Sequence, residues 1–555
     1  MKSFRLLPAA TVAALAVVVA LPVAFVLLQA VFPYLAQGSL DAFREPFSAV
    51  WPTLSHDNTL PLVTNTLRLG LSVALGTALV GGALGAVRGL FHVPGARLWD
   101  LCFLLPFLVP PYLAALGWML LLQTGGYAQQ LTGLDAGHFL FSLPGLVFVM
   151  TLNIFPVVYF AVSRALATTG SRLADVARVH GASAWRAFAR VTLPLALPAF
   201  AASLLLAFTM AIEEFGAPAA LGARAGFSVL VTAIEGRFAD WPIDLPGASI
   251  LSIVLAVIAL FAFVLQHRLA AGKDFETQTG KPIASPPRAL GRWQVPVLFG
   301  FGMVALLATA APLFSILATA FSGTLSGGLS LANLTTAHFA ALVGQGAEGF
   351  EALATSLSLA LGTSLVTGVL GFLCAWCVVK STMRARVLID GLSLLPHALP
   401  GIVVGVGLIL AWNLPFWPVT PYNTWGILLL SYSCLLLPYP VRYTSAALRQ
   451  TAASLEAAAR VHGAPAGVAL RRITLPLVMP ALGASLMIVF AIASRELVTS
   501  LLLAPSGVQT VSIFVWRQFE QGSIGQGMAM GVVSMMVSGT LLALASKLNG
   551  KPANG

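Results

Sequence analysis

Long apolar stretches alternate with short polar segments along the whole chain. Each stretch holds about 20 residues, the length that an α-helix needs to cross a hydrocarbon core of about 30 Å. Twelve such windows predict twelve membrane-spanning helices, and we therefore expect an all-α, polytopic membrane protein. The windows lie near residues 8–32, 63–87, 99–122, 144–164, 196–215, 246–266, 294–320, 354–379, 389–412, 425–445, 477–496 and 526–546.

A polar segment rich in Lys, Arg, Pro and Gly divides the windows into two sets of six. We expect a first half over residues 1–270, a cytoplasmic linker over 271–293 and a second half over 294–555. Because each half has an even number of spans, the second half enters the membrane from the same side as the first. The two halves are then parallel six-helix repeats related by an axis along the membrane normal.

Charged residues make up only 9% of the chain, against about 25% in an average soluble domain. The net charge of +11 comes from basic residues in the short loops between windows, as the positive-inside rule requires of cytoplasmic loops. This distribution places both termini in the cytoplasm and argues against nucleic-acid binding. The apolar run that begins at Leu7 is too long for a cleaved signal peptide, so it predicts a retained first span.

One polar segment occurs twice. Residues 178–199 read RVHGASAWRAFARVTLPLALPA and residues 460–481 read RVHGAPAGVALRRITLPLVMPA, so about 14 of 22 positions match. Each copy carries several arginines between apolar windows, and a lipid-buried segment does not tolerate them. Both copies are therefore expected to be cytoplasmic loops, each with short helices interrupted at a glycine.

Two pairs of prolines repeat in the same way. Pro106 and Pro110 lie in the third window, and Pro396 and Pro400 hold the matching places in the ninth. Because proline lacks a backbone donor and clashes with the preceding turn, both spans are expected to be kinked or interrupted. Broken helices often line the pathway of transporters, but prolines also occur in ordinary membrane helices, so both interpretations stand.

Charged side chains are rare inside the windows, which makes those that occur candidates for function. Glu213 and Glu214 end the fifth span, and Arg495 and Glu496 hold the matching places at the end of the eleventh. These carboxylates face a central cavity, where their oxygens suit a hard cation, or they form an interfacial salt bridge that holds a gate or meets a partner protein.

Other reactive side chains predict neither catalysis nor a bound cofactor. His180 and His462 belong to the two repeated loops, and His397 is a single histidine in the ninth span. Cys374 and Cys377 are spaced as in a redox motif but lie in an apolar span, where packing is their expected role. The sequence leaves metal binding unknown.

The repeated loop resembles the Glu-Ala-Ala loop of the permease subunits of binding-protein-dependent ABC importers, whose pattern continues through a glycine to a final Leu-Pro. Gly181, Val191, Leu193 and Pro194 match in the first copy, and Gly463, Ile473, Leu475 and Pro476 match in the second. The opening departs from the pattern, because its glutamate position holds Asp175 in one copy and Ala457 in the other, with Glu456 one residue earlier. The resemblance implies that the loops insert into two cytosolic ATPase subunits and couple to them through Asp175, Arg178, Gly181, Pro194, Glu456, Arg460, Gly463 and Pro476.

A single chain with both permease halves is most similar to the fused permeases of ferric-iron importers, and permeases for thiamine, phosphonates or polyamines have a similar layout. The resemblance implies a type I importer permease in a bacterial inner membrane, with ferric iron delivered by a periplasmic binding protein. No phosphate-binding loop for ATP occurs, since each Gly-Lys pair is followed by Asp or Pro. The outward segments have about 30 residues at most, too few for a ligand-binding domain with its own core.

Two other classes remain as alternatives. A secondary transporter driven by an ion gradient is also built from repeated halves, but it needs ionisable groups deep in its spans and no dock for an ATPase. A membrane enzyme needs a convergent nucleophile, base or metal, and the sequence offers none. The conspicuous signal of this chain lies in its cytoplasmic loops, which favours the ABC permease.

Overall fold

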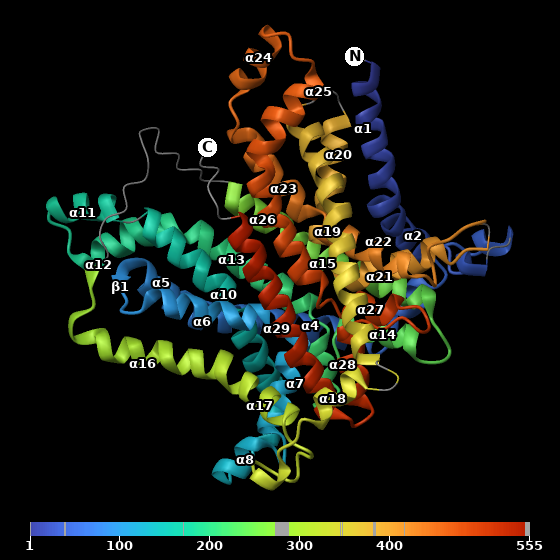
Figure 1. Cartoon of the computed structure of the whole chain (residues 1–555). Coiled ribbons are helices and arrows are strands. Elements are labelled where there is room, and N and C mark those ends of the chain that lie inside the picture. The colour runs from blue at the N-terminus through green and yellow to red at the C-terminus, as the bar shows by residue number, and fades with distance from the viewer. Residues whose placement is uncertain are drawn as a thin grey trace. The chain divides into compact units, whose positions relative to one another are not determined.

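A computed structural model of the chain describes nearly all of its residues, and these are mostly helical (Figure 1). Most of the predicted linker, residues 272–287, lies outside the described residues. The described ranges are 2–37, 40–169, 171–271, 288–344, 346, 348–380, 385–415 and 417–549.

The prediction of an all-α polytopic membrane protein is confirmed. Within the described residues, nine helices are long and apolar enough to cross a membrane, and two bent helix pairs raise the number to eleven. The remaining predicted span, near residues 425–445, corresponds to α22 (Trp425–Leu436) and α23 (Pro438–Gln450), which are separated by Leu437. Each is shorter than the bilayer requires of a single helix.

The chain divides into two compact units that do not coincide with the two sequence halves. The first unit comprises residues 1–55, 234–256 and 336–555, and the second comprises 56–233 and 257–335. Each unit thus combines the later spans of one half with the first span of the other half. Helices α14 (Leu230–Ala239) and α15 (Leu245–Ala271) cross the boundary between the units.

The first unit contains α1 (Lys2–Leu15), η1 (Ala16–Ala20), α2 (Leu21–Val31), η2 (Leu35–Gln37), η3 (Leu40–Phe43), α3 (Val50–Ser55), α18 (Ala337–Val343), α19 (Glu348–Lys380), α20 (Ala385–Leu394), η10 (Leu395–Ala398), α21 (Gly401–Trp412), α22, α23, α24 (Ala453–Val461), α25 (Ala466–Ala469), η11 (Leu470–Thr474), α26 (Leu475–Ala493), α27 (Val498–Leu503), α28 (Val511–Glu520) and α29 (Ile524–Asn549).

The second unit contains α4 (Thr59–Thr77), η4 (Ala78–Gly82), α5 (Ala83–Leu90), β1 (Phe91–His92), α6 (Ala96–Leu108), α7 (Pro111–Leu122), α8 (Tyr127–Thr132), α9 (Gly137–Leu140), α10 (Leu143–Thr169), α11 (Ser171–Val179), α12 (Ala184–Ala187), η5 (Phe188–Thr192), α13 (Leu193–Glu213), η6 (Pro218–Gly222), β2 (Arg288–Ala289), η7 (Gly291–Trp293), α16 (Gln294–Ala305), η8 (Leu306–Ala310), α17 (Ala311–Ala320) and η9 (Leu331–Asn333). Its two short strands pair in parallel.

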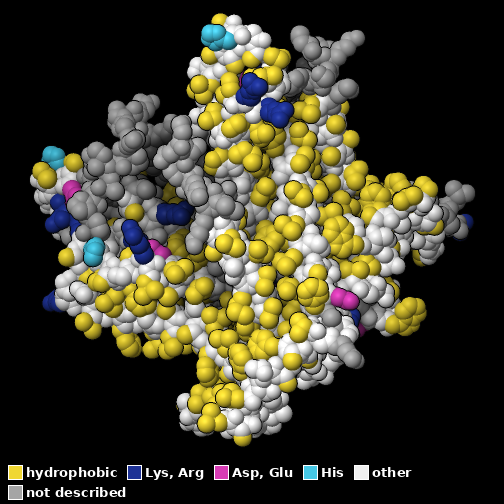
Figure 2. All heavy atoms as spheres, in the orientation of Figure 1, with side chains coloured by type: hydrophobic (Ala, Val, Ile, Leu, Met, Phe, Trp, Pro, Cys, Tyr) yellow, Lys and Arg dark blue, Asp and Glu magenta, His cyan; other side chains and the backbone are white. Residues whose placement is uncertain are grey.

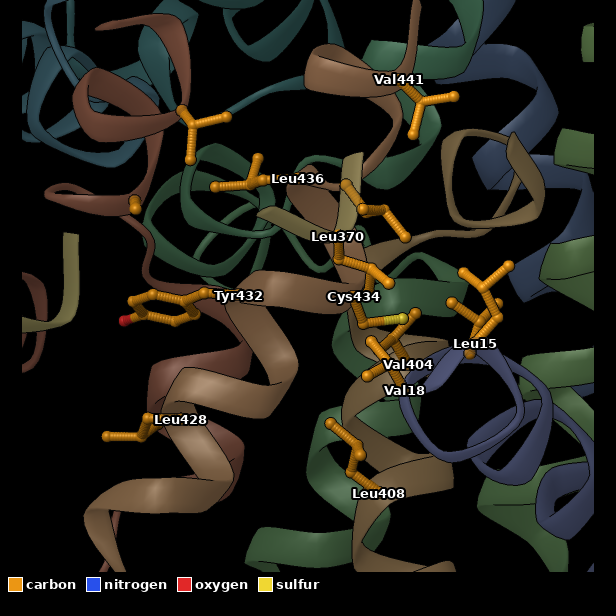
Figure 3. Packing of buried hydrophobic residues seen from close by; sticks show 14 of the residues in the cluster. Leu15, Val18, Leu370, Val404, Leu408, Leu428, Tyr432, Cys434, Leu436 and Val441 are labelled. Carbon is orange, nitrogen blue, oxygen red and sulfur yellow. The ribbon is translucent and has the colours of Figure 1, made fainter. Parts of the chain in front are cut away.

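The core of the first unit shows how the N-terminal span joins the second half. Leu15 and Val18 of this span pack with Val404 and Cys434 in one buried cluster (Figure 3). A Cβ atom at Gly407 would lie 2.4 Å from the backbone oxygen of Pro22, so only glycine allows α2 and α21 to approach so closely.

The second unit contains the matching contact between α7 and α17. The Ser315 hydroxyl donates to the backbone oxygen of Gly117 at 2.6 Å, and a Cβ atom at Gly117 would lie 2.9 Å from the backbone oxygen of Pro312. A small residue and a hydroxyl hydrogen bond are the usual means by which helices adhere in lipid. The first span of each half therefore packs within the unit built from the other half.

Widened helical turns recur at matching places in the two halves. In each of them the residue after the turn donates to the carbonyl five residues back, and a proline follows at the next position. The wider turn accommodates the proline ring, which would clash with a carbonyl in a regular α-helix. The four turns are η1 and η8, which are 290 residues apart, and η5 and η11, which are 282 residues apart.

The long helices expose apolar side chains, as expected of surfaces that contact lipid (Figure 2). Leu71, Leu75 and Leu79 form an exposed stripe with a spacing of four residues along α4 and η4. The matching residues Leu361, Leu365 and Val369 form the same stripe on α19. An exposed apolar stripe on a long apolar helix is suited to hydrocarbon rather than water.

Candidate functional site

The first repeated loop, defined here as residues 171–192, consists of α11, a tight turn, α12 and the widened turn η5. Gly181 has a φ of +88°, which L side chains rarely adopt. The backbone N–H of Ala182 donates to the oxygen of Ala177 at 3.0 Å, and that of Gly181 donates to the oxygen of Arg178 at 3.0 Å. This pair of bonds is a Schellman motif, which satisfies the last carbonyls of α11 and turns the chain sharply.

The second repeated loop, residues 453–474, has the same construction from α24, α25 and η11. Gly463 has a φ of +78°. The N–H of Ala464 donates to the oxygen of Ala459 at 2.9 Å, and that of Gly463 donates to the oxygen of Arg460 at 3.0 Å. The chain therefore makes the same helix and the same turn in both halves, with a glycine where each turn requires one.

Beyond the turn, each loop runs without a break into the following span. Pro194 and Pro476 lie at the second position of α13 and α26, directly after the widened turns. Figure 1 shows α11 and α12 beyond the end of α13, and α24 and α25 beyond the end of α26. The loops are thus extensions of membrane helices, so a force on a loop acts directly on a span.

The loops present apolar side chains to the surroundings. Val179 and Val461 occupy matching positions at the ends of α11 and α24, and each is 85% exposed. Trp185, in the first loop, is 74% exposed. Each exposed valine follows an arginine, Arg178 or Arg460, and Trp185 precedes Arg186, so each loop combines exposed apolar and basic side chains.

The acidic residue of the first loop bonds to the end of the linker. Asp175 Oδ1 accepts from Arg288 Nη2 at 3.0 Å, and both side chains are about half exposed. Arg288 begins the short strand β2, which pairs with β1 after α5. This ion pair therefore joins α11 to the linker strand, at a solvent-exposed position where such a pair contributes little stability.

The acidic residue of the second loop is more enclosed. Glu456 Oε1 accepts from Thr474 Oγ1 at 2.8 Å and from Lys380 Nζ at 3.1 Å. The Lys380 and Glu456 side chains are 18% and 14% exposed. Burial raises the pKa of Glu456, but the hydrogen bonds from Thr474 and Lys380 and the charges of Lys380 and Arg460 outweigh it, so its pKa lies below the ordinary value.

The proline pairs lie where two spans break. Residues 96–106 and 111–132 meet at 93°, and residues 385–398 and 401–412 meet at 114°. Pro110 and Pro400 stand at the two breaks, directly before α7 and α21. Since Pro110 has no N–H to offer the carbonyl four residues back, the Asn153 side chain donates to the Pro106 oxygen instead, at 3.0 Å.

The carboxylates at the ends of the fifth and eleventh spans lie next to these breaks. Glu496 accepts from the backbone N–H of Thr499 at 3.2 Å, and a Cβ atom at Gly401 would lie 4.0 Å from Glu496 Oε1. Glu214 accepts from the N–H of Gly216 at 2.9 Å, and Gly216 packs against Tyr112 at the start of α7. Within each unit, the structure thus brings a predicted carboxylate to a predicted proline break.

The other two predicted charges are placed differently. Glu213 is the last residue of α13, and its Oε1 atom is buried without a hydrogen-bond partner among the residues that the structure describes. Arg495 follows α26, and its backbone N–H donates to the oxygen of Ile492 at 3.2 Å. The described part of the chain has no group of three or more His, Cys, Asp or Glu side chains placed to hold a metal ion.

A cavity of about 600 Å³ in the first unit was not indicated by the sequence. Glu348 and Glu351 of α19 line it together with Glu520, Arg517 and Trp516 of α28. The Trp516 indole donates to Glu520 at 2.7 Å. These residues belong to segments that the charge distribution places on the outward side, and they converge only through folding, because Glu351 of α19 lies 165 positions before Trp516 of α28.

Comparison with known proteins identifies the relatives of this chain. The model of the family described as binding-protein-dependent transport system inner membrane component matches residues 78–274 and again residues 367–551. A ferric transport system permease protein of Actinobacillus pleuropneumoniae is 25% identical over 86% of this chain and 69% of its own length. An Fe(3+)-transport system permease protein of Haemophilus influenzae is 24% identical over 88% and 89%. A putative 2-aminoethylphosphonate transport system permease protein of Salmonella typhimurium is 27% identical over 43% of this chain and 86% of its own length.

The lowered pKa of Glu456 predicts a pH-dependent anchor for the second loop. A group whose pKa is depressed in the folded state adds stability above its unfolded pKa, about 4.3 for glutamate, and that stability is lost as the pH falls through the folded value. We expect amide exchange in α24 to be unchanged between neutral pH and about pH 5 and to accelerate as the pH falls below about 4. Mass-spectrometric hydrogen exchange, corrected for intrinsic rates, measures this.

The matched variant is Glu456→Gln, in which the extra acceleration below pH 4 should disappear. Equal acceleration in the variant and the wild type would show that another group controls the loop.

Proposed function

The chain belongs to the family of binding-protein-dependent transport system inner membrane components, and on that premise we propose that it is the permease of an ATP-driven importer, with one cytosolic ATPase subunit docked on each repeated loop. The observation that carries this proposal is the duplicated surface of the loops. The same helix, Schellman turn and exposed valine occur in both halves. Loops that served only to fix the orientation of the spans in the membrane would need the arginines but not this repeated backbone shape.

The energy for transport would come from the partner subunits. The chain itself has no phosphate-binding loop. Because α12 and α25 continue into spans, rotation of a docked ATPase would turn α13 and α26 directly. The proposed orientation puts both loops and both termini in the cytoplasm of a bacterium, in agreement with the positive-inside rule.

We place the gate at the two broken spans. In each unit a carboxylate lies beside the break: Glu214 near α7 and Glu496 near α21. Both carboxylates accept backbone N–H bonds, which partly offset the cost of placing a carboxyl group next to apolar helices. Pro106, Pro110, Pro396 and Pro400 would shape the breaks, and Glu213 and Arg495 would adjust the local charge.

Ferric iron delivered by a periplasmic binding protein is the proposed cargo. The ferric permeases are similar over most of the chain, whereas the 2-aminoethylphosphonate permease is similar over 43% of it. The outward segments of the first unit are also acidic. Burial and the charges of Asp240 and Glu520 raise the pKa of Glu235, which shows that carboxylates gather there. Such a surface attracts cations and repels phosphonates; thiamine and polyamines remain the alternatives among cationic cargoes.

Docking through the exposed valines gives a direct prediction. Val179→Asp and Val461→Asp place a charge in an interface that should exclude water, so each should weaken binding of the ATPase encoded by a neighbouring gene by about 2 kcal/mol or more. Affinity purification with quantification of bound ATPase measures the loss. Val419→Asp, at a similarly exposed valine outside the loops, is the control and should bind ATPase normally.

If both loop variants retained wild-type ATPase binding, the proposed dock would be wrong.

The gate proposal predicts a loss of transport without a loss of assembly. Glu214→Gln combined with Glu496→Gln keeps an oxygen acceptor for the backbone N–H groups but removes both carboxyl groups. Uptake into proteoliposomes should fall by about tenfold, equivalent to about 1.4 kcal/mol of lost transition-state stabilisation. The control is Asp57→Asn, which removes a carboxyl group in an outward segment and should leave uptake near the wild-type rate. Unchanged transport by an intact double variant would remove both glutamates from the mechanism.

The cargo is tested with the complete system. Proteoliposomes containing the chain and its ATPase, with the binding protein encoded nearby, should accumulate radioactive ferric iron only when ATP is supplied on the cytoplasmic side. Thiamine, 2-aminoethylphosphonate and spermidine should neither accumulate nor compete. ATP-dependent uptake of one of these three compounds, without iron uptake, would assign the permease to that cargo instead.

A further inference from the structure

The second loop is tied to a membrane span through a side chain rather than only through the backbone. Glu456 in α24 bonds to Lys380, the last residue of α19, and to Thr474, the residue before α26. One carboxylate thus connects three elements. We propose that Lys380 and Glu456 are positioning residues that make α24 and α19 move as one body, so that the second loop passes the motion of its ATPase to α19. This inference rests on the proposed function.

The pair is built to hold a fixed geometry. Both side chains are mostly shielded from solvent, at 18% and 14% exposure, and Glu456 accepts from two donors on different elements. Removing one partner would leave the other charged group without its bond in a shielded site, which is far less favourable than breaking an exposed pair. The bond between Lys380 and Glu456 is therefore less easily broken than a surface ion pair when the loop moves.

The element attached to this pair reaches the opposite side of the unit. Helix α19 has 33 residues, from Glu348 to Lys380, and at a rise of about 1.5 Å per residue it is longer than the bilayer core. Its first turn carries Glu348 and Glu351, which line the 600 Å³ cavity. A rigid helix with the ion pair at one end and the cavity at the other is a physical route from the ATPase dock to the outward surface.

The first loop is attached differently at the matching position. Position 174, which matches Glu456, is alanine, and Asp175 bonds instead to Arg288 in the linker strand. That pair is about half exposed and ends on a short strand rather than on a span. The two loops therefore have the same backbone but different attachments at this position, and among the described side chains it is Glu456 of the second loop that bonds to a span.

The experiment measures ATP hydrolysed per cargo molecule transported, in proteoliposomes with the full chain, its ATPase and its binding protein. Lys380→Met and Glu456→Gln should each keep bound ATPase and its hydrolysis while this ratio rises about tenfold, equivalent to about 1.4 kcal/mol of lost coupling. The charge-swapped double variant Lys380→Glu with Glu456→Lys should bring the ratio back to within about threefold of wild type. Arg288→Met, which breaks the exposed pair with Asp175 from the linker side, is the matched control and should change the ratio by less than about twofold.

The outcomes separate this inference from the proposed function. A wild-type ratio in both single variants overturns the inference while the ATPase dock stands, and a wild-type chain that binds no ATPase overturns the proposed function itself. If the single variants fail to assemble, spin labels at Ser454→Cys in α24 and Val366→Cys in α19, in a chain with its native cysteines replaced by serine, provide the test. The distance between the labels should be equal in nucleotide-free and vanadate-trapped complexes; a shift between the two states overturns the inference.

Discussion

Backbone polar groups cannot remain unpaired in hydrocarbon, and this constraint accounts for most of the architecture. It requires long helices. It also means that wherever a span contains proline, which has no N–H, the carbonyl four residues back needs another hydrogen-bond donor or a change in the helical turn. The chain uses two solutions. Widened turns precede prolines such as Pro194 and Pro476, which keeps the loops continuous with their spans. True breaks occur at Pro110 and Pro400, and at the first break Asn153 donates to the carbonyl that proline leaves open. Continuous spans can transmit force, and broken spans offer polar backbone for a gate.

Patterns of local origin were predictable from the sequence. The spans follow from hydrophobic length, the repeat follows from the duplicated loop, and the turns at Gly181 and Gly463 follow from the freedom of glycine at positive φ. The breaks in the third and ninth spans could be predicted from the spacing of their prolines. Proline alone is not sufficient, however, because the helices at Pro194 and Pro476 continue without a break. What decides between the two outcomes is whether the preceding turn widens, and the sequence pattern carries no clear signal for that.

Contacts between distant segments were not predictable. The packing of the first span against α21 depends on Gly407, which as a sequence position is one of many glycines in apolar windows. Lys380 marked only the cytoplasmic end of a span, and nothing in the sequence linked it to Glu456, which lies 76 positions later. The outward cavity brings together α19 and α28 in the same way. Pairings of this kind depend on tertiary packing, and a single sequence offers no covariation from which to infer them.

The proposed function requires that each of the two loops, which share the same backbone turn, holds one ATPase subunit. Native mass spectrometry of the complex purified from its host membrane tests this most directly, because it counts subunits without assuming a cargo. We predict one copy of this chain with two copies of an ATPase subunit, or one each of two related ATPase subunits. A complex with one ATPase per chain, or with none under conditions in which the binding protein stimulates transport, would contradict the account.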